Sequence, residues 1–302
     1  MSVAELEARE IQLEAPSGLW SDAWRRLLRN PAAIIGIALV ALFVLTALFA
    51  DLIAPYDPRE QNLDLLQGSC CPGPSADHWF GVDALGRDQF SRVVYGARFS
   101  LLIGVVSVTV GVTFGLVLGS VAGFLGGKTD TLIMRLMDIM LSVPGLLMAI
   151  GIAAMLGPGL LSIMIAIGVV NVPIFARLLR GSVLGQKSND FVLAARSVGV
   201  PRRTILFSHI LPNAISPLIV AATLALATAI IDAAGLGFLG LGPQDPSTPE
   251  WGTMLTDTVR YLQTAPHLAI IPGLAIVISV LGFNLIGDGL REALDPKLRG
   301  RT

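Results

Sequence analysis

The sequence predicts an all-α polytopic membrane protein with six transmembrane helices. Of its 302 residues, 53% are hydrophobic and only 14% are charged, and the mean hydropathy is +0.72. This composition lies outside the range of ordinary soluble domains. In addition, six apolar runs are long enough to cross the hydrocarbon core of a bilayer, which is about 30 Å thick and requires about 20 helical residues.

The six apolar runs divide the chain at clear positions. They lie at residues 32–50, 99–124, 131–156, 160–176, 214–241 and 268–287. These bounds predict a tail at 1–31, a first span with an external loop at 32–98, a five-helix core at 99–288 and a second tail at 289–302. In the second run, Gly111 and Gly115 have the four-residue spacing that allows two helices to pack closely in lipid.

Lysine and arginine are unevenly distributed over the segments that connect these runs. If the N-terminus lies inside, most of the 21 basic residues fall on the cytoplasmic side. The positive-inside rule therefore predicts a multi-pass protein of the cytoplasmic (inner) membrane with both termini in the cytoplasm. Before the first span, the sequence predicts a short amphipathic helix. Its apolar face contains Trp20, Trp24, Leu27 and Leu28, and its basic face contains Arg25, Arg26 and Arg29. We expect this helix to lie on the inner membrane surface.

Patterns typical of an enzyme or a metal centre are missing from the sequence. The three histidines, His78, His209 and His267, fall on two sides of the predicted membrane, so we expect no histidine-based metal site. The stretch GFLGGKTD at 123–130 imitates a phosphate-binding loop, but Ala122 stands where the first glycine is required. The net charge of −1 gives no support to nucleic-acid binding. We therefore expect no catalytic residue and no cofactor in this chain.

Three polar side chains within the predicted spans are candidates for a translocation path. Asp232 lies in the fifth run, where a carboxylate at the bilayer centre costs about 2.5–3.5 kcal/mol. Such a group either faces the bundle interior or a wet pathway, or it lies near the outer headgroups and is solvated. Asn171 and Asn284 are further candidates, and a hydrogen bond between helices is the alternative for each.

A basic insert separates the fourth and fifth runs and occupies much of the connection at 177–213. Either Ser188 or Asn189 can cap a short helix there, Gly199 suits the position just past its end, and Pro201 suits the first turn of a new helix. A short helix, a sharp turn and a second helix make a rigid protrusion. Anchoring to lipid headgroups would explain the arginines of the insert but not this capping pattern.

The insert LAARSVGVPRRTILFSHILPN resembles the EAA loop of importer-type ABC permeases. The pattern of that loop is Glu-Ala-Ala, three residues, Gly, and a later Ile or Leu followed by Pro. Leu193 stands where the family has Glu, and His209 where many members have Ile. In this family the short helix at 189–199 is the coupling helix, which docks on a cytoplasmic ATPase. The resemblance implies that the ATPase is coupled through Asp190, Ala194, Ala195, Arg196, Gly199, Pro201, Leu211 and Pro212.

Other segments, at 78–104, 237–255 and 283–300, are similar to the second permease subunit of dipeptide, oligopeptide and nickel importers. The similarity extends over about residues 25–300. It implies an importer-type ABC permease fold and a peptide importer that contains a homologous sister permease, ATPase subunits that bind ATP and Mg, and an external substrate-binding protein. A nickel-chelate or other small-solute importer of the same family, an ion-coupled secondary transporter and a structural scaffold are the alternatives.

The predicted external loop has two notable features. By analogy with the family, its amphipathic segment at 78–98 is expected to lie on the membrane surface and to receive the binding protein. The residues expected to contact that external partner are Gly86, Arg87, Asp88 and Arg92. The adjacent Cys70 and Cys71 are compatible with a ring disulfide, with disulfides to a partner and with free thiols.

Overall fold

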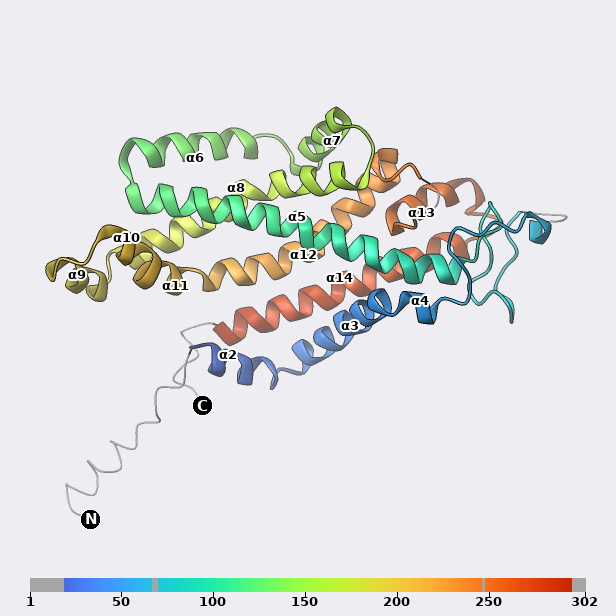
Figure 1. The fold of residues 1–302 in the computed structure, drawn as a ribbon, viewed down its shortest axis with the longest axis horizontal. Helices are drawn as coiled ribbons and strands as arrows, with labels where there is room; N and C mark the ends of the chain where they lie inside the picture. The colour runs from blue at the N-terminus through green and yellow to red at the C-terminus, as the bar shows by residue number, and fades with distance from the viewer. Residues whose placement is uncertain (1–18, 67–69, 246–247, 295–302) are drawn as a thin grey trace, which may run out of the picture.

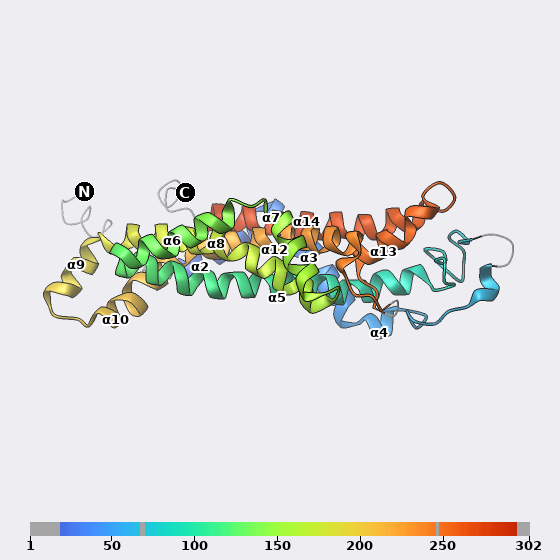
Figure 2. The ribbon, with the colours of Figure 1, turned by 90° about the horizontal axis from the view of Figure 1, so that it is seen from above.

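The computed structural model describes residues 19–66, 70–245 and 248–294. Within these ranges the protein is built from helices, and the β-type pairing found there is one isolated bridge between Val82 and Asp88. The long helices run side by side and form an elongated, flattened bundle (Figure 1; Figure 2). The all-α prediction is therefore confirmed. The predicted tails at 1–31 and 289–302 lie partly outside the described residues.

The helices follow one another with short connections, except in the external loop. The first half of the chain forms α2 (Leu19–Leu27), α3 (Pro31–Leu48), α4 (Ala50–Ile53), η1 (Leu63–Leu66), α5 (Gln89–Leu125), α6 (Gly127–Leu141) and α7 (Gly145–Leu156). The second half forms α8 (Leu160–Lys187), α9 (Asp190–Ser197), α10 (Arg202–Thr204), η2 (Ile205–Ile210), α11 (Leu211–Ala214), α12 (Ser216–Leu236), η3 (Gly237–Leu241), α13 (Trp251–Thr258), η4 (Val259–Tyr261) and α14 (His267–Leu294).

Five of these helices, α3, α5, α8, α12 and α14, are each long and apolar enough to cross a membrane. The third predicted span is not one straight helix, because α6 and α7 meet at a bend of 89°. The bend lies at Ser142–Pro144, where the proline lacks a backbone N–H and disfavours helical geometry in the preceding residue. The apolar character continues through the bend, so hydropathy alone predicted a continuous span.

Two further boundaries differ from the sequence-based prediction. Helix α5 begins at Gln89, ten residues before the predicted second span, because the Asp88 carboxylate caps it by accepting a hydrogen bond of 2.7 Å from the Ser91 N–H. The segment that was expected to lie on the membrane surface is thus partly a continuation of the span. Helix α8 extends to Lys187, so the connection to the fifth span begins at residue 188 and not at 177.

The tightest contact in the bundle joins α5 to α8. Glycines at 111, 115, 119 and 123 repeat every four residues along the facing side of α5. A methyl group added to Gly115 would lie 2.4 Å from the Cβ of Phe175. The backbones therefore approach more closely than side chains would allow, as the glycine spacing predicted. This pair of helices forms the central layer against which α7 and α12 also pack (Figure 1).

Candidate functional site

The cytoplasmic insert predicted from the sequence folds as a short helix with a defined end. Asn189 occupies the N-cap position of α9, although its side-chain amide donates to Gln186 and not to the helix. At the other end, Gly199 has a φ of 80°, and its N–H donates to the Arg196 carbonyl at 3.0 Å. The next N–H, of Val200, donates to the Ala195 carbonyl, also at 3.0 Å. This is a Schellman motif, so the predicted role of Gly199 as a helix terminator is confirmed.

One face of α9 packs inward and the other is open. Val192 and Ala195 are buried, whereas Ala194 is exposed, so only one of the two alanines belongs to the outer surface. The exposed side also carries apolar side chains, among them Leu193 and Val198, which is 79% exposed. Leucine at the position of the family's glutamate therefore gives the outer face of α9 an apolar character.

The inward face joins the insert to the membrane bundle. Val192 and Ala195 belong to the same apolar core as Ile205 and Ile210 of η2 and as Leu179 of α8. Packed side chains therefore connect α9 to the bundle. Of the other predicted coupling residues, Asp190, Arg196, Pro201 and Pro212 are exposed and Leu211 is half-buried.

The three candidate path residues do not share one environment. Asp232 and Asn284 are half-buried on α12 and α14. Asn171 is buried between α8 and α5, where its side-chain amide donates a hydrogen bond of 2.9 Å to the Ile167 carbonyl of its own helix. Its Cβ also faces Gly111 across the helix contact. In this chain Asn171 is thus a packing residue of the α5–α8 contact.

The structure brings the four predicted external residues together, but mainly as an internal network. Asp83 organises the turn by accepting hydrogen bonds from the Leu85 N–H at 2.9 Å and the Arg87 N–H at 3.0 Å. Its other oxygen receives the Arg87 Nε at 2.6 Å and lies 3.4 Å from the Arg92 Nε. The two arginines are only 2% and 3% exposed.

Gly86 and Asp88 complete this turn in backbone and capping roles. Gly86 has a φ of 75°, which a side chain would disfavour, and a Cβ there would lie 2.3 Å from the Asn62 carbonyl oxygen. Asp88 caps α5 and lies 2.9 Å from the His78 Nδ1. All four residues that were expected to contact an external partner therefore have structural roles within this chain.

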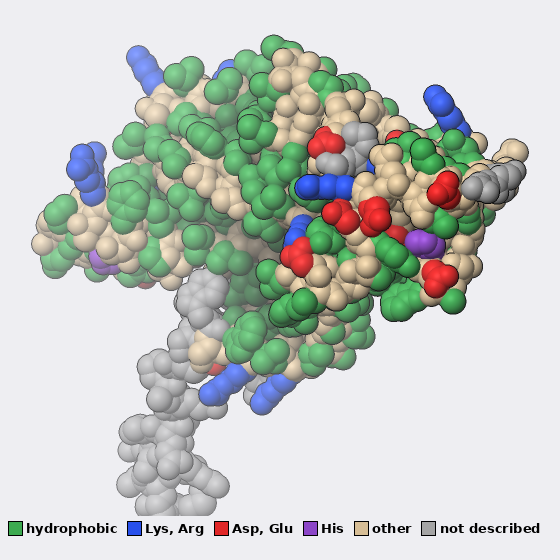
Figure 3. Space-filling model, turned by 45° about the vertical axis from the view of Figure 1, so that its right-hand side comes forward, with side chains coloured by type: hydrophobic (Ala, Val, Ile, Leu, Met, Phe, Trp, Pro, Cys, Tyr) green, Lys and Arg blue, Asp and Glu red, His purple; other side chains and the backbone are tan. Residues whose placement is uncertain are grey.

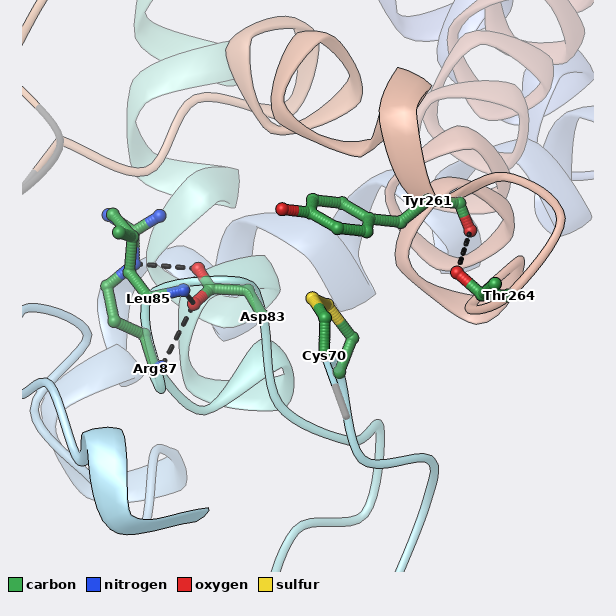
Figure 4. The surroundings of a disulfide bond; sticks show 7 residues. Cys70, Asp83, Leu85, Arg87, Tyr261 and Thr264 are labelled. Atoms are coloured by element: carbon green, nitrogen blue, oxygen red, sulfur yellow. Dashed lines mark hydrogen bonds and ion pairs between the residues drawn. A yellow bond between two sulfur atoms is a disulfide. The ribbon is translucent and has the colours of Figure 1, made fainter. Parts of the chain in front are cut away.

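The adjacent cysteines form a disulfide with each other. Cys71 is buried and packs with Ala265 and Leu268 near the start of α14. Figure 4 shows the disulfide between the Asp83–Arg87 turn and Tyr261. The disulfide thus lies in the contact between the external loop and the α13–α14 connection. Among residues 19–66, 70–245 and 248–294, no group of three or more His, Cys, Asp or Glu side chains is placed to hold a metal ion.

Sequence reasoning missed two residues that fix the external ends of the helices. Glu250 is 1% exposed, and it caps α13 by accepting hydrogen bonds of 2.8 Å from the Gly252 and Thr253 N–H groups. Burial raises the pKa of the Glu250 carboxyl, against the opposing effect of these hydrogen bonds. The neighbouring Trp251 is fully buried, and its indole N–H donates to the Val93 carbonyl of α5 at 3.1 Å. The signal available in the sequence was Glu250, an acidic residue that can cap a helix, followed directly by Trp251.

Ion pairs between α6 and α8 were also not predicted. The Arg180 guanidinium binds both oxygens of Asp130, at 2.5 and 2.6 Å. Eight residues further along α6, Asp138 pairs with Arg177, which lies three residues before Arg180 on α8. These contacts stabilise the otherwise largely exposed α6 against α8, since Met137 is the one fully buried side chain of α6.

Comparisons with known proteins agree with the fold. Residues 115–300 match the family described as the inner membrane component of binding-protein-dependent transport systems. Residues 18–68 match the N-terminal transmembrane domain of oligopeptide transport permease C. In structure, the chain is similar to the methionine ABC transporter MetNI in an inward-facing conformation, with a TM-score of 0.58 and 20% identity over 68% of this chain and 97% of that one.

Two relatives extend the similarity to nearly the whole chain. The dipeptide transport system permease protein of Alkalihalophilus pseudofirmus is 49% identical over 280 residues, which cover 93% of this chain and 90% of the relative. The glutathione transport system permease protein of Escherichia coli O6:K15:H31 (strain 536 / UPEC) is 48% identical over 282 residues, which cover 93% and 91%. The chain therefore belongs to the binding-protein-dependent transport system inner membrane components, as a multi-pass permease subunit.

Proposed function

We propose that this permease belongs to an ATP-driven importer of peptides and that α9 is the site at which a cytoplasmic ATPase engages it. The substrate class follows from the relatives, because one is named for dipeptides and another for glutathione, which is itself a tripeptide. ATP and Mg would be bound by the ATPase subunits. An external binding protein would deliver the peptide, and both termini of the permease would lie in the cytoplasm.

The observation that carries the coupling role is the packing of the insert. The Schellman motif at Gly199 fixes the end of α9, and Val192 and Ala195 connect it to the core of the bundle. Asp190, Ala194 and Arg196 lie on the open side, where they would contact the ATPase. Pro201, Leu211 and Pro212 lie in the segments that lead back into α12 and would transmit the movement.

A second permease subunit would cover the polar side of α12. Partly exposed side chains recur along this helix at Ala221, Ala225, Thr228 and Asp232, so this stripe is small or polar. Exposed side chains on α3 are instead large and apolar, as at Leu42, Leu45 and Leu48. A carboxylate facing lipid is costly. We therefore place the translocation path, with Asp232 and Asn284 as candidate lining residues, between this chain and a homologous sister permease.

The test is ATP-dependent uptake of a labelled dipeptide by the reconstituted complex of permeases, ATPases and binding protein. Ala194→Trp places a bulky side chain on the open face of α9 and is expected to abolish uptake while the permease still folds. Lys128→Trp, at the exposed start of α6, is the matched control and is expected to retain uptake. Uptake driven by a proton gradient without an ATPase would contradict the proposal.

A further inference from the structure

The external end of the chain contains a cavity of about 480 Å³. It is lined by residues of the Asp83–Arg92 segment, of η3, of 243–245 together with Thr248, of α13 and of η4. Figure 3 shows acidic and basic side chains next to one another on this face. Cavities that bind small molecules commonly have volumes of about 300–1,000 Å³, so this one has room for a short peptide.

The walls of the cavity are held by ion pairs and hydrogen bonds within the chain. On one side, Arg87 and Arg92 converge on Asp83 and are almost fully buried. On the other side, Glu250 caps α13, and the Thr256 hydroxyl donates to the Gly237 and Phe238 carbonyls at 3.2 and 3.0 Å. A site that is already ordered loses little conformational entropy on binding.

Two charged side chains at the rim are accessible to a ligand, and they have opposite signs. The side chain of Asp257 is 61% exposed, and its carboxylate forms an ion pair with the Arg87 guanidinium at 3.7 Å, which is beyond hydrogen-bond distance. Arg260 is also exposed. These residues are three apart at the junction of α13 with η4, a spacing that places side chains on one face about 5–6 Å apart at Cβ.

We propose that this cavity is a receiving site for short zwitterionic peptides, in which Asp257 binds the α-ammonium group and Arg260 binds the α-carboxylate. A dipeptide spans at most about 7 Å between its ends, which matches the spacing of the two rim residues. A simple anion or cation would use only one of these charges, whereas a free peptide uses both. The assignment rests on the proposed function, since it takes the imported solute to be a peptide.

The test measures equilibrium binding to the complete transporter in lipid nanodiscs, with the binding protein left out. The probes are alanyl-alanine, N-acetyl-alanyl-alanine, which lacks the ammonium group, and alanyl-alanine amide, which lacks the carboxylate. We expect the wild type to bind the zwitterion about tenfold more tightly than either capped form. Asp257→Asn should remove the preference over the acetylated peptide only, and Arg260→Gln the preference over the amide only.

Matched controls lie elsewhere on the external loop. Asp64→Asn and Arg59→Gln change exposed charges that do not line the cavity, and they should preserve both preferences. The proposal is overturned if the wild-type complex shows no saturable binding, or if the rim variants keep the wild-type preferences.

The proposed function is tested separately by uptake with the binding protein present. If the wild-type transporter imports no peptide at all, the proposed function fails, whatever the binding result. If import is normal and the rim variants discriminate between the probes as the wild type does, only the receiving site is refuted.

Discussion

Replacing Gly115 with alanine is expected to separate α5 from α8 and to destabilise the bundle. The added Cβ would lie 2.4 Å from the Cβ of Phe175 and 3.0 Å from the backbone nitrogen of Ala176. Carbon atoms in ordinary contact are about 3.5–4.0 Å apart, so the helices must move apart by about 1 Å. Because both obstructing atoms are part of, or directly attached to, the α8 backbone, no side-chain rotation relieves the clash.

The expected magnitude follows from two opposing effects. Overpacking of a close contact costs about 1–3 kcal/mol, whereas alanine in place of glycine within a helix gains about 0.5–1 kcal/mol. Taking the middle of each range, the net loss for Gly115→Ala should be about 1 kcal/mol. Gly181→Ala is the matched control, because Gly181 lies within α8 and an added Cβ there meets nothing within 4 Å. That variant should be slightly more stable than the wild type.

The assay is thermal unfolding of the detergent-solubilised complex. A change of 1 kcal/mol shifts Tm by about 2–4 °C in domains of 150–250 residues, so the two variants should fall on opposite sides of the wild type. Equal Tm values for Gly115→Ala and Gly181→Ala would refute the close approach of α5 and α8. A loss of uptake without a change in Tm would point to a role for Gly115 in movement instead of packing.

Three further predictions concern the ends of the helices. Gly199→Val should cost about 1–2 kcal/mol at the end of α9 because its φ of 80° disfavours a β-branched residue, and it should reduce peptide uptake, whereas Gly199→Asn should retain most of it. As pH rises through the raised pKa of Glu250, the wild type acquires a buried charge and loses stability, whereas the amide of Glu250→Gln stays neutral. The Tm of Glu250→Gln should therefore rise relative to that of the wild type, and parallel curves of Tm against pH would contradict this. Asp130→Asn should loosen α6 from Arg180, seen as faster hydrogen exchange in α6 but not in α3.

Much of the architecture was predictable because lipid imposes a simple rule on sequence. Every backbone polar group in the bilayer must be satisfied internally, so long apolar runs become helices. The same rule does not report where an apolar run bends, which is why the 89° break at Pro144 was missed. The same rule does not predict where a helix begins if its first turns lie before the apolar run. Helix α5 is an example, because it begins at Gln89, ten residues before the predicted span.

The insert was predictable for a different reason. Capping depends on a few local residues, and the glycine at 199 with a proline two residues later indicates a helix end directly. Which side chains of α9 are buried was harder to predict, because the burial of Ala195 depends on its packing in one core with residues of the η2 segment. The external cavity was not predictable at all, since its walls come from separate segments that only the tertiary fold brings together.

Helix α5 has a mechanical consequence that its composition does not reveal. It contains 37 residues, which corresponds to a rod of about 55 Å, nearly twice the hydrocarbon thickness. Its outer end carries Arg92 of the cavity wall, and its inner end is tied to α8 by a hydrogen bond of 2.8 Å from Lys187 to the Phe124 carbonyl, just before α9 begins. One continuous helix thus connects the end of the bundle next to α9 with the end that contains the cavity, so a tilt imposed at the first end would reshape the cavity in the same motion.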